Sequence, residues 1–391
     1  MKKSLSILGS TGSIGLTTLK IIDKKKKDFK PLLFSANKNY KLICKQIQKY
    51  KPKYFVINNY NVFNKVKKRF KYIKGIKILN DFNIIKLKKK IDITITAIPG
   101  IEGLKPTIFA ARFSKKLLLA NKESIICGWD ILKKIIKKNK TNIIPIDSEH
   151  FSIFKLLKKE DYKNINKIYI TASGGPFLNF KLNNLKKVKP SDALKHPKWK
   201  MGKKISIDSS TLMNKVLEVI EAQKIFNISP KKISIVIHPE SLIHALIELK
   251  NGLTYFIYHE TSMTVPISNA IFEKNLDIKD FLKTNKFKFQ NKLKNLTFRN
   301  VDTKLFPTVN LINDINKYPS ASIIVNACNE ILVDQFLRKN IEFLSIFRTI
   351  KTILNDRNYK KYAIRRPQNI NQIIEIDLWS RKQTMKKLIR I

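Results

Sequence analysis

Short apolar runs alternate with amphipathic stretches through the first 150 residues of the chain. The runs have the length and composition of strands, and most of the stretches between them have helical spacing. A regular alternation of strand and helix is typical of a parallel sheet with helices on its faces. The sequence therefore predicts an α/β fold that opens with a Rossmann-like parallel sheet, with strands at 4–8, 30–35, 54–57, 91–97, 116–119 and 142–146.

The pattern changes near residue 150. Longer loops separate the next candidate strands, which lie at 167–171, 233–237 and 254–258. Helical periodicity dominates the end of the chain, including 322–337 and 343–355. We expect an N-terminal domain at 1–148, a central α/β domain at 149–275, a charged linker at 276–300 and a C-terminal helical domain at 301–391.

The composition fits a globular protein. The chain has 391 residues, of which 43% are hydrophobic, enough for two or three domains with their own cores. No apolar run approaches the roughly 18 residues that span a bilayer. Glycines interrupt the first apolar run, so no secretory signal is recognisable and we expect a cytoplasmic protein. Cys44, Cys127 and Cys328 lie far apart and are expected to be reduced thiols.

The formal charge of +49 suggests a nucleic-acid partner. However, lysine far outnumbers arginine, the residue that reads bases and grips phosphates bidentately. The lysines also run from end to end instead of forming one stripe. A compositional drift toward Lys, Ile and Asn explains these features together. We expect no specific nucleic-acid partner and no membrane association, although a basic nucleic-acid-binding protein without turnover stays open as an alternative.

A glycine-rich turn, Gly9-Ser10-Thr11-Gly12-Ser13-Ile14-Gly15, joins the first predicted strand to a helix. Glycines allow a tight turn and close approach to a pyrophosphate, which the helix N-terminus attracts. The spacing is G-x-x-G-x-x-G, one residue longer than the strict dinucleotide fingerprint. The second strand ends Ala36-Asn37-Lys38-Asn39, without the acid that usually binds a ribose 2′-hydroxyl. Because Lys38 suits a 2′-phosphate instead, the sequence favours NADPH over NADH.

Three acidic residues predict a metal site. Asp147 closes the apolar run 142–146, and Glu149 falls in the first turn of the helix predicted after it. Glu218 lies at the end of 209–218, a segment dense in groups that bind phosphate. Carboxylate oxygens are hard ligands that suit Mg²⁺ or Mn²⁺. Metal ligands beside groups that bind phosphate indicate an enzyme that acts on a small phosphorylated substrate.

Two turns and a loop add further polar groups. The segment 120–123 follows a strand at its carboxyl end, where α/β active sites gather. The turn 171–176 can offer the Ser173 hydroxyl and backbone N–H groups to an anion. The loop 196–202 combines an imidazole, an indole and a thioether, a mixture that suits a lid over a polar substrate.

The helix that carries Glu218 is expected to begin with Ser209 or Ser210 as its N-cap. Asn214 and Glu218 are spaced i,i+4 and share a face of that helix. Lys215 is about 4.5 Å along the axis from Glu218, so phosphate and metal could be held at opposite ends of one small molecule. For His238 and His244 we favour a packing and hydrogen-bonding role over a zinc pair.

Taken in order, these motifs resemble the 1-deoxy-D-xylulose 5-phosphate reductoisomerase family. The resemblance covers nearly the whole chain and is carried by 9–15, 120–124, 147–150, 173–177, 196–202, 213–218, 238–244 and 326–330. It implies a homodimeric enzyme of non-mevalonate isoprenoid biosynthesis that needs NADPH and Mg²⁺ or Mn²⁺, with Co²⁺ as an alternative. The reaction would be a retro-aldol/aldol rearrangement followed by reduction of an aldehyde, giving 2-C-methyl-D-erythritol 4-phosphate.

The resemblance also implies roles for single residues. The metal ligands would be Asp147, Glu149 and Glu218. The phosphate would be held by Ser173, Ser209, Asn214 and Lys215, with His196 beside it. The reacting oxygens would meet Lys122, Ser148 and Glu149, and the catalytic group would comprise Glu149, Lys122 and Asp147. The lid would be formed by Trp199 and Met201. We expect cofactor contacts from Thr11, Gly12, Ser13, Ile14, Asn37, Lys38, Asn39, Asn121, Glu123 and Gly202.

The chain departs from the family pattern at two places. The family's second nucleotide motif usually reads Ala-Gly-basic-Asn, where this chain has Ala36-Asn37-Lys38-Asn39. Near the nicotinamide the family commonly has Pro-Asp-Met-Arg, where this chain has Thr261-Ser262-Met263-Thr264. We therefore predict weaker NADPH binding than in a typical relative. A simple NADPH-dependent dehydrogenase without rearrangement is the nearest alternative, and metal dependence would distinguish the two.

Overall fold

The computed structural model describes residues 2–158, 160–199, 201–273, 276–282 and 295–389. Close contacts between residues divide the chain into two compact units. The first unit consists of 1–124, 130–151 and 262–288. The second consists of 125–129, 152–261 and 289–391.

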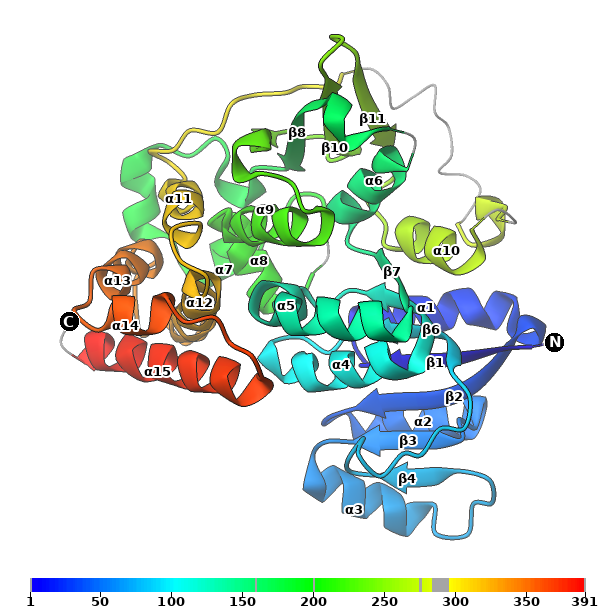
Figure 1. Cartoon of the computed structure of the whole chain (residues 1–391). Coiled ribbons are helices and arrows are strands. Elements are labelled where there is room, and N and C mark those ends of the chain that lie inside the picture. Colours follow the sequence, from blue (N-terminus) through cyan, green and yellow to red (C-terminus); the bar gives the residue numbers. More distant parts are fainter. Residues whose placement is uncertain (1, 159, 200, 274–275, 283–294, 390–391) are drawn as a thin grey trace. The chain divides into compact units, whose positions relative to one another are not determined.

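The first unit contains a seven-stranded sheet in the order β4-β3-β2-β1-β5-β6-β7. Every neighbouring pair in this sheet is parallel. The strands β1 to β4 (blue shades in Figure 1) lie side by side, and the chain then returns to the other side of β1. The strand bounds are β1 Lys3–Leu8, β2 Phe29–Ala36, β3 Tyr54–Ile57, β4 Lys77–Leu79, β5 Ile91–Thr96, β6 Ser114–Leu119 and β7 Asn142–Pro145.

The strand order reverses beside β1, so the crevice at the carboxyl ends of β1 and β5 is where such sheets bind ligands. The helices of this unit follow the strands, and asparagine side chains cap several of them. Asn39, Asn59 and Asn121 each accept a backbone N–H at the start of a helix. The helix bounds are α1 Ser13–Lys24, α2 Tyr40–Tyr50, α3 Tyr60–Arg69, α4 Leu104–Phe113, α5 Lys122–Asn139 and α10 Thr264–Phe272.

The second unit contains a four-stranded mixed sheet in the order β11-β10-β8-β9. Strands β8 and β9 pair in parallel, whereas β10 pairs antiparallel with both β8 and β11. The strand bounds are β8 Ile165–Ala172, β9 Ile233–Ile237, β10 Ile243–Leu249 and β11 Thr254–Tyr258.

The helices of the second unit supply its polar site and the C-terminal region. Their bounds are α7 Pro190–Ala193, α8 Lys203–Ser210, α9 Met213–Phe226, α11 Leu311–Ile315, α12 Ala321–Leu337, α13 Ser345–Leu354, α14 Tyr359–Ala363 and α15 Ile370–Ile389. Helix α6, Ser148–Leu157, begins in the first unit and ends in the second. Short 3₁₀ turns lie at η1 Lys26–Asp28, η2 Ile101–Gly103, η3 Tyr162–Asn164, η4 Gly175–Phe177, η5 Leu182–Lys187, η6 Pro230–Lys232, η7 Ile278–Asp280 and η10 Pro307–Asn310.

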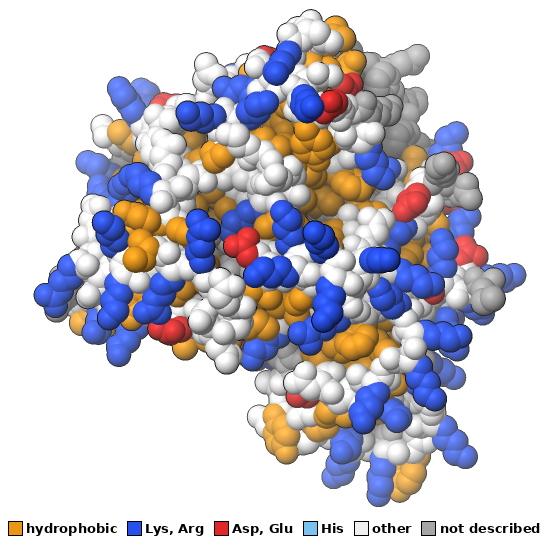
Figure 2. Space-filling view, in the orientation of Figure 1, with side chains coloured by type: hydrophobic (Ala, Val, Ile, Leu, Met, Phe, Trp, Pro, Cys, Tyr) orange, Lys and Arg blue, Asp and Glu red, His pale blue; other side chains and the backbone are white. Residues whose placement is uncertain are grey.

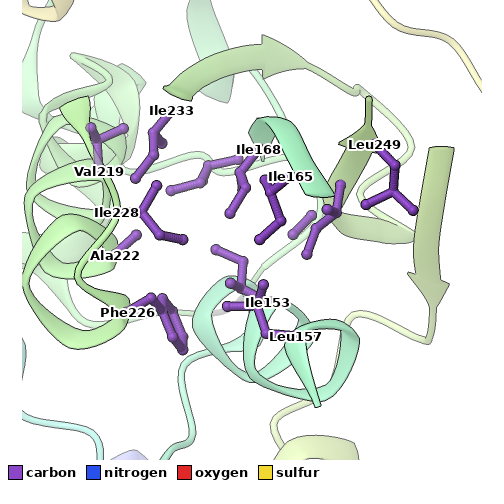
Figure 3. Close-up of a cluster of buried hydrophobic side chains, with 13 residues drawn as sticks. Ile153, Leu157, Ile165, Ile168, Val219, Ala222, Phe226, Ile228, Ile233 and Leu249 are labelled. Atoms are coloured by element: carbon purple, nitrogen blue, oxygen red, sulfur yellow. The ribbon is translucent and has the colours of Figure 1, made fainter. Parts of the chain in front are cut away.

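A cluster of thirteen buried apolar side chains fixes α6 and α9 on the sheet of the second unit (Figure 3). Ile168 and Ile170 of β8 face this cluster, as do Ala245, Ile247 and Leu249 of β10, in keeping with the period of two in a strand. Ile153 and Leu157 enter it from α6, and Val219 and Ala222 enter it from α9. Each buried Ile or Leu contributes about 1.5–3 kcal/mol of stabilisation. The polar residues at the starts of α6 and α9 are therefore held on firmly packed helices.

The predicted fold class is confirmed, with a parallel first sheet, a mixed second sheet and a helical C-terminal region. Two strands were not predicted from the sequence: β4, which has only three residues, and β10, which follows a short turn after β9. Of the predicted linker 276–300, residues 283–294 lie outside the described part of the structure. The division into these four segments stays a prediction.

Lysine and arginine side chains are spread over the face of the molecule shown in Figure 2, and acidic ones are few there. This distribution agrees with the compositional drift expected from the sequence. The three cysteines are buried free thiols. Among the described residues, no helix has both the length and the apolar character needed to cross a membrane.

Candidate active site

The turn after β1 presents backbone N–H groups at the start of α1. Gly9 has a φ of 90°, and a Cβ atom there would lie 2.6 Å from the carbonyl oxygen of Ala97. At Gly15 a Cβ atom would lie 2.4 Å from the oxygen of Gly9, so both positions require glycine. Helix α1 begins at Ser13 without a side-chain cap. Its first N–H groups can therefore bind an anion.

Neighbouring elements hold this turn in place. The backbone N–H groups of Gly9 and Ser10 donate to the oxygen of Ser35 at the end of β2, at 3.1 and 2.8 Å. Gln46 on α2 binds Ser10 twice, accepting from its hydroxyl at 2.6 Å and donating to its carbonyl oxygen at 2.9 Å. The Gln46 contact was not predicted, although Gln46 shares the buried face of α2 with Ile43 and Ile47.

Exposed polar side chains follow β2 beside that turn. Asn37, Lys38 and Asn39 are all exposed, and Asn39 Oδ1 also caps α2 by accepting from the Leu42 N–H at 3.1 Å. The ammonium group of Lys38 is thus available to a phosphate at the carboxyl end of β2. The arrangement fits the ribose 2′-phosphate that the sequence predicted there.

Asn121 ties together two loops at the carboxyl ends of β5 and β6. Its Oδ1 accepts from the Ser124 N–H at 2.9 Å, and its Nδ2 donates to the oxygens of Ile98 and Gly100 at 2.7 and 3.1 Å. Nδ2 also donates to Glu123 Oε2 at 2.9 Å. Asn121 and Glu123 are buried, so their bonds fix the two loops, and Lys122 between them is partly exposed.

The acidic motif lies where β7 meets α6. Asp147 Oδ1 accepts from the Glu149 N–H at 3.2 Å and from His150 Nδ1 at 3.1 Å. The Ser148 hydroxyl donates to Glu149 Oε2. Glu149 is 8% exposed and lies in the first turn of α6, where the helix dipole stabilises a carboxylate. The motif therefore directs two anionic side chains to the start of one helix.

Glu218 is the third acid and is almost fully buried on α9. Its two carboxylate oxygens accept from residues one turn earlier, Oε1 from Asn214 Nδ2 and Oε2 from Lys215 Nζ, the latter at 2.8 Å. These bonds fix the carboxylate and compensate its charge, as a buried acid requires.

The three acids can supply a metal site. One carboxylate oxygen from each of Asp147, Glu149 and Glu218 lies within 4.8 Å of the other two. Glu149 is on α6 and Glu218 on α9, two helices whose later residues share the core of Figure 3. Oxygen donors of this kind fit Mg²⁺ or Mn²⁺ better than a soft metal ion. The donor set therefore fits the predicted cation.

Ser173, His196 and Lys215 form the polar site of the second unit. His196 Nδ1 accepts the backbone N–H groups of Trp199 and Lys198, at 2.9 and 3.2 Å. Burial, followed by the nearby charge of Lys215, lowers the pKa of His196 to about 4. The imidazole is therefore neutral at pH 7, and its Nε2–H donates to Ser173 Oγ at 3.0 Å.

Ser173 Oγ also accepts the Gly175 N–H at 3.2 Å. Because the oxygen already accepts two hydrogen bonds, its own hydroxyl proton points to another acceptor. Gly175 lies against α8, where a Cβ atom would come within 2.9 Å of the oxygen of Ser209. The Ser173 hydroxyl and the nearby positive charge of Lys215 thus lie within the second unit, and both suit a phosphate group.

Comparison with known proteins agrees with this geometry. Residues 5–128 match the model of the 1-deoxy-D-xylulose 5-phosphate reductoisomerase family, and 143–226 and 259–383 match models of two C-terminal domains of that enzyme. The reductoisomerase of Pelagibacter ubique is 44% identical over 385 residues, covering 95% of this chain and 96% of the relative. That of Clostridium novyi is 40% identical over 359 residues, covering 90% and 92%. The chain belongs to this family.

Solved structures of the family have the same fold. A reductoisomerase in complex with NADPH, fosmidomycin and magnesium superposes with a TM-score of 0.91 at 29% identity, covering 99% of this chain and 98% of that one. The Zymomonas mobilis reductoisomerase in complex with NADPH superposes with a TM-score of 0.85 at 30% identity, covering 99% of both chains. The family resemblance and the fold expected from the sequence are both confirmed.

One local prediction about this reductoisomerase chain was wrong. Ser209 and Ser210 do not cap the helix that carries Glu218, because they are the last residues of α8. The Ser210 hydroxyl donates back to the oxygen of Ile207 at 2.8 Å. Helix α9 begins at Met213 after Leu212, which has a φ of 59° and gives no side-chain cap. Ser209 still lies beside Gly175 in the turn after β8, although on a different helix from Glu218.

The predicted lid residues lie in the irregular stretch before α8. Trp199 and Met201 are partly exposed, Gly202 is the N-cap of α8, and Lys200 lies outside the described residues. The Trp199 ring meets the His244 ring edge-on, with 6.1 Å between centroids. His238 has the packing role expected of it, because its ring stacks on Phe298 and its Nδ1 donates to the oxygen of Thr297 at 2.9 Å.

Proposed function

We propose that this chain rearranges 1-deoxy-D-xylulose 5-phosphate and reduces the product to 2-C-methyl-D-erythritol 4-phosphate, using NADPH and a divalent cation. The observation that carries the proposal is the convergence of Asp147, Glu149 and Glu218, in a chain of this family. When bound, the cation polarises the substrate's carbonyl and hydroxyl oxygens and NADPH supplies a hydride. The product lies in non-mevalonate isoprenoid biosynthesis.

We propose that Asp147, Glu149 and Glu218 hold Mg²⁺ or Mn²⁺. The hydrogen bonds from Asn214 and Lys215 fix the Glu218 carboxylate, and the Glu149 N–H fixes Asp147. Such supporting bonds keep ligands in place before the ion arrives. Co²⁺ is expected to substitute, because it accepts the same oxygen donors.

Phosphate binding is assigned to Ser173, Ser209, Asn214 and Lys215, with His196 beside it. The unused proton of Ser173 and the ammonium group of Lys215 are the donors that support this role. Neutral His196 orients Ser173 and bonds the backbone of Trp199, so it joins the phosphate site to the lid. Trp199 and Met201 would close over the substrate and exclude water.

Lys122, Ser148 and Glu149 are assigned to the reacting oxygens. The Ser148 hydroxyl donates to Glu149, and this bond holds the carboxylate in place. Glu149 can move a proton to or from a substrate hydroxyl during the rearrangement. With Asp147, these residues form the proposed catalytic group.

The cofactor is assigned to the first unit, within the predicted domain 1–148. Thr11, Gly12, Ser13 and Ile14 are partly or fully exposed at the start of α1, and this accessibility supports a pyrophosphate contact. The 2′-phosphate is assigned to Asn37, Lys38 and Asn39. Asn121 and Glu123 of the same unit are further predicted contacts, and Gly202, which belongs to the second unit, completes the predicted set.

We propose that residues 149–275 provide catalysis and dimerisation, joined by the linker 276–300 to the helical domain 301–391. Strand β11 is the edge of the second sheet, and Tyr255 and Phe256 on it are 38% and 47% exposed. Leu253, directly before the strand, is 50% exposed. An exposed apolar edge strand favours pairing with another chain. A homodimer in the cytoplasm, without a specific nucleic-acid or membrane partner, is the assembly we expect.

The experiment that tests the function is NADPH oxidation at about 340 nm, the wavelength at which the reduced nicotinamide absorbs. The substrate is 1-deoxy-D-xylulose 5-phosphate, with and without Mn²⁺. We expect oxidation that requires the metal and collapses in Glu149→Gln. Oxidation that persists in chelator would instead favour a simple dehydrogenase. A folded protein without any turnover would contradict the proposal.

A further inference from the structure

Three aromatic rings in the second unit form a continuous contact that the roles above do not use. Trp199 comes from the loop before α8, His244 from β10 and His259 from the residue after β11. The Trp199 and His244 centroids are 6.1 Å apart at an interplanar angle of 67°. The His244 and His259 centroids are 4.0 Å apart at 20°, a stacked pair.

Backbone hydrogen bonds hold the two imidazoles. The His259 N–H donates to the oxygen of Leu242 at 3.0 Å, and His259 Nδ1 donates to the oxygen of Glu260 at 2.8 Å. His244 Nε2 donates to the oxygen of His259 at a longer 3.4 Å. Both rings are buried, with exposed fractions of 2% for His244 and 7% for His259. The imidazole pair is therefore a fixed wall against which the partly exposed indole rests.

We propose that His259 is a positioning residue that sets the place of Trp199 through His244. The inference rests on the proposed lid role of Trp199. A loop residue that closes over a substrate binds it more weakly when the closed arrangement is rarely populated. By fixing the ring behind the indole, His259 raises the population of the closed lid before the substrate arrives.

Removal of the ring tests this role. In His259→Ala, His244 loses the surface it stacks on, and the indole loses a fixed neighbour. We expect the KM for 1-deoxy-D-xylulose 5-phosphate to rise about three- to tenfold, with kcat changed less than twofold. His259→Phe keeps a ring of similar area without the Nδ1–H. We expect this variant to stay within twofold of wild type, because stacking is the property that matters.

A spectroscopic measurement follows Trp199 without any need for activity. The chain has three tryptophans, and replacing Trp129 and Trp379 by Phe leaves Trp199 as the single emitter. In that background we expect His259→Ala to raise the quenching constant for acrylamide about twofold, since the indole becomes more accessible. Phe298→Ala is the control, because it removes a ring stacked at 4.8 Å on His238 instead. We expect no change in quenching for Phe298→Ala or for His259→Phe.

The possible results distinguish failure of the proposed role of His259 from failure of the proposed enzymatic function. Unchanged quenching and KM in a folded His259→Ala variant would overturn the proposal, as would equal effects of Ala and Phe at this position. If the parent protein has no turnover, the proposed function fails, and the quenching series still decides whether His259 positions Trp199. If His259→Ala does not fold, the acrylamide quenching constants of His259→Phe and Phe298→Ala can still be compared. Higher quenching in His259→Phe alone would then overturn the proposal.

Discussion

In the first unit, the turn after β1 offers a ligand its backbone N–H groups, and glycines keep side chains out of the way. In the second unit, the turn after β8 offers a side-chain hydroxyl that is aimed by an imidazole from a distant loop. The first arrangement depends on space at Gly9 and Gly15, where a Cβ atom would meet backbone atoms. The second depends on the protonation state of His196. Substitutions in the two regions to which phosphate binding is assigned should therefore have different consequences.

The largest effect is expected at Glu218, a proposed metal ligand that accepts hydrogen bonds from Asn214 and Lys215. Glu218→Gln keeps the shape of the side chain but removes its charge. We expect kcat/KM to fall about a thousandfold, because a bound cation contributes several kcal/mol to catalysis. Steady-state NADPH oxidation across a Mn²⁺ series checks this. Glu248→Gln, on β10, is the matched control and should retain activity within twofold. A Glu218→Gln variant with over a tenth of wild-type activity would contradict the metal assignment.

The glycine turn provides the next largest effect. In Gly15→Ala the new Cβ atom meets the oxygen of Gly9 at 2.4 Å and Ser10 Cα at 2.6 Å, so the backbone must move. Overpacking of this kind costs about 1–3 kcal/mol. We expect the NADPH dissociation constant to rise about 10- to 100-fold, measured by fluorescence titration.

Gly12→Ala is the control for the stability of that turn. Its Cβ atom would lie 3.5 Å from the oxygen of Gly9, an ordinary contact. We expect the melting temperature of Gly12→Ala to match wild type and that of Gly15→Ala to fall by several degrees. Equal melting temperatures in the two variants would show that the turn adapts to a side chain at Gly15.

The two regions also differ in how much the sequence could predict. The glycine turn and the pair Asp147 and Glu149 each lie within a short segment, so local spacing indicated their chemistry. Glu218 lies on another helix and was joined to them because its segment is dense in groups that bind phosphate. The Ser209 and Ser210 cap was wrong because their place on α8 depends on a helix break at Leu212. The bonds of His196 to Ser173 and of Gln46 to Ser10 join separate elements, which spacing does not reveal. For Gln46, a polar residue on the buried face of α2 was the available signal.

The His196 region predicts a pH dependence that the glycine turn lacks. The folded-state pKa of His196 is about 4, below the ordinary value of 6.5. The unfolded chain therefore binds the proton more readily, and this residue's contribution to stability is present above pH 6.5 and lost as pH falls toward 4. His196→Asn retains an acceptor for the Trp199 N–H but does not titrate. We expect wild type to lose more stability than His196→Asn between pH 7 and pH 4, measured by thermal unfolding. Parallel curves would contradict a neutral His196.

A smaller effect is expected at the adenosine end of the cofactor. Lys38→Ala removes the cation assigned to the 2′-phosphate, and one charge-assisted hydrogen bond is worth about 1.5 kcal/mol or somewhat more. We expect the KM for NADPH to rise about tenfold while the KM for NADH stays unchanged. Lys41→Ala, an exposed lysine in the first turn of α2, is the control and should leave both constants unchanged. An equal rise in the KM values for NADPH and NADH would contradict the assignment of Lys38 to the 2′-phosphate.

The smallest effect concerns Asn37, which stands where the family usually has glycine. Asn37 is exposed, and replacing it by glycine removes a Cβ atom from the surface that a nucleotide would approach. We expect Asn37→Gly to lower the KM for NADPH by about threefold at most, because no hydrogen bond or buried contact is gained. The parent KM should exceed that of a relative carrying both Ala-Gly-basic-Asn and Pro-Asp-Met-Arg. If the KM of the unsubstituted protein for NADPH is equal to or below that of the relative, the side chain at position 37 does not weaken NADPH binding, and the backbone of this turn determines the affinity.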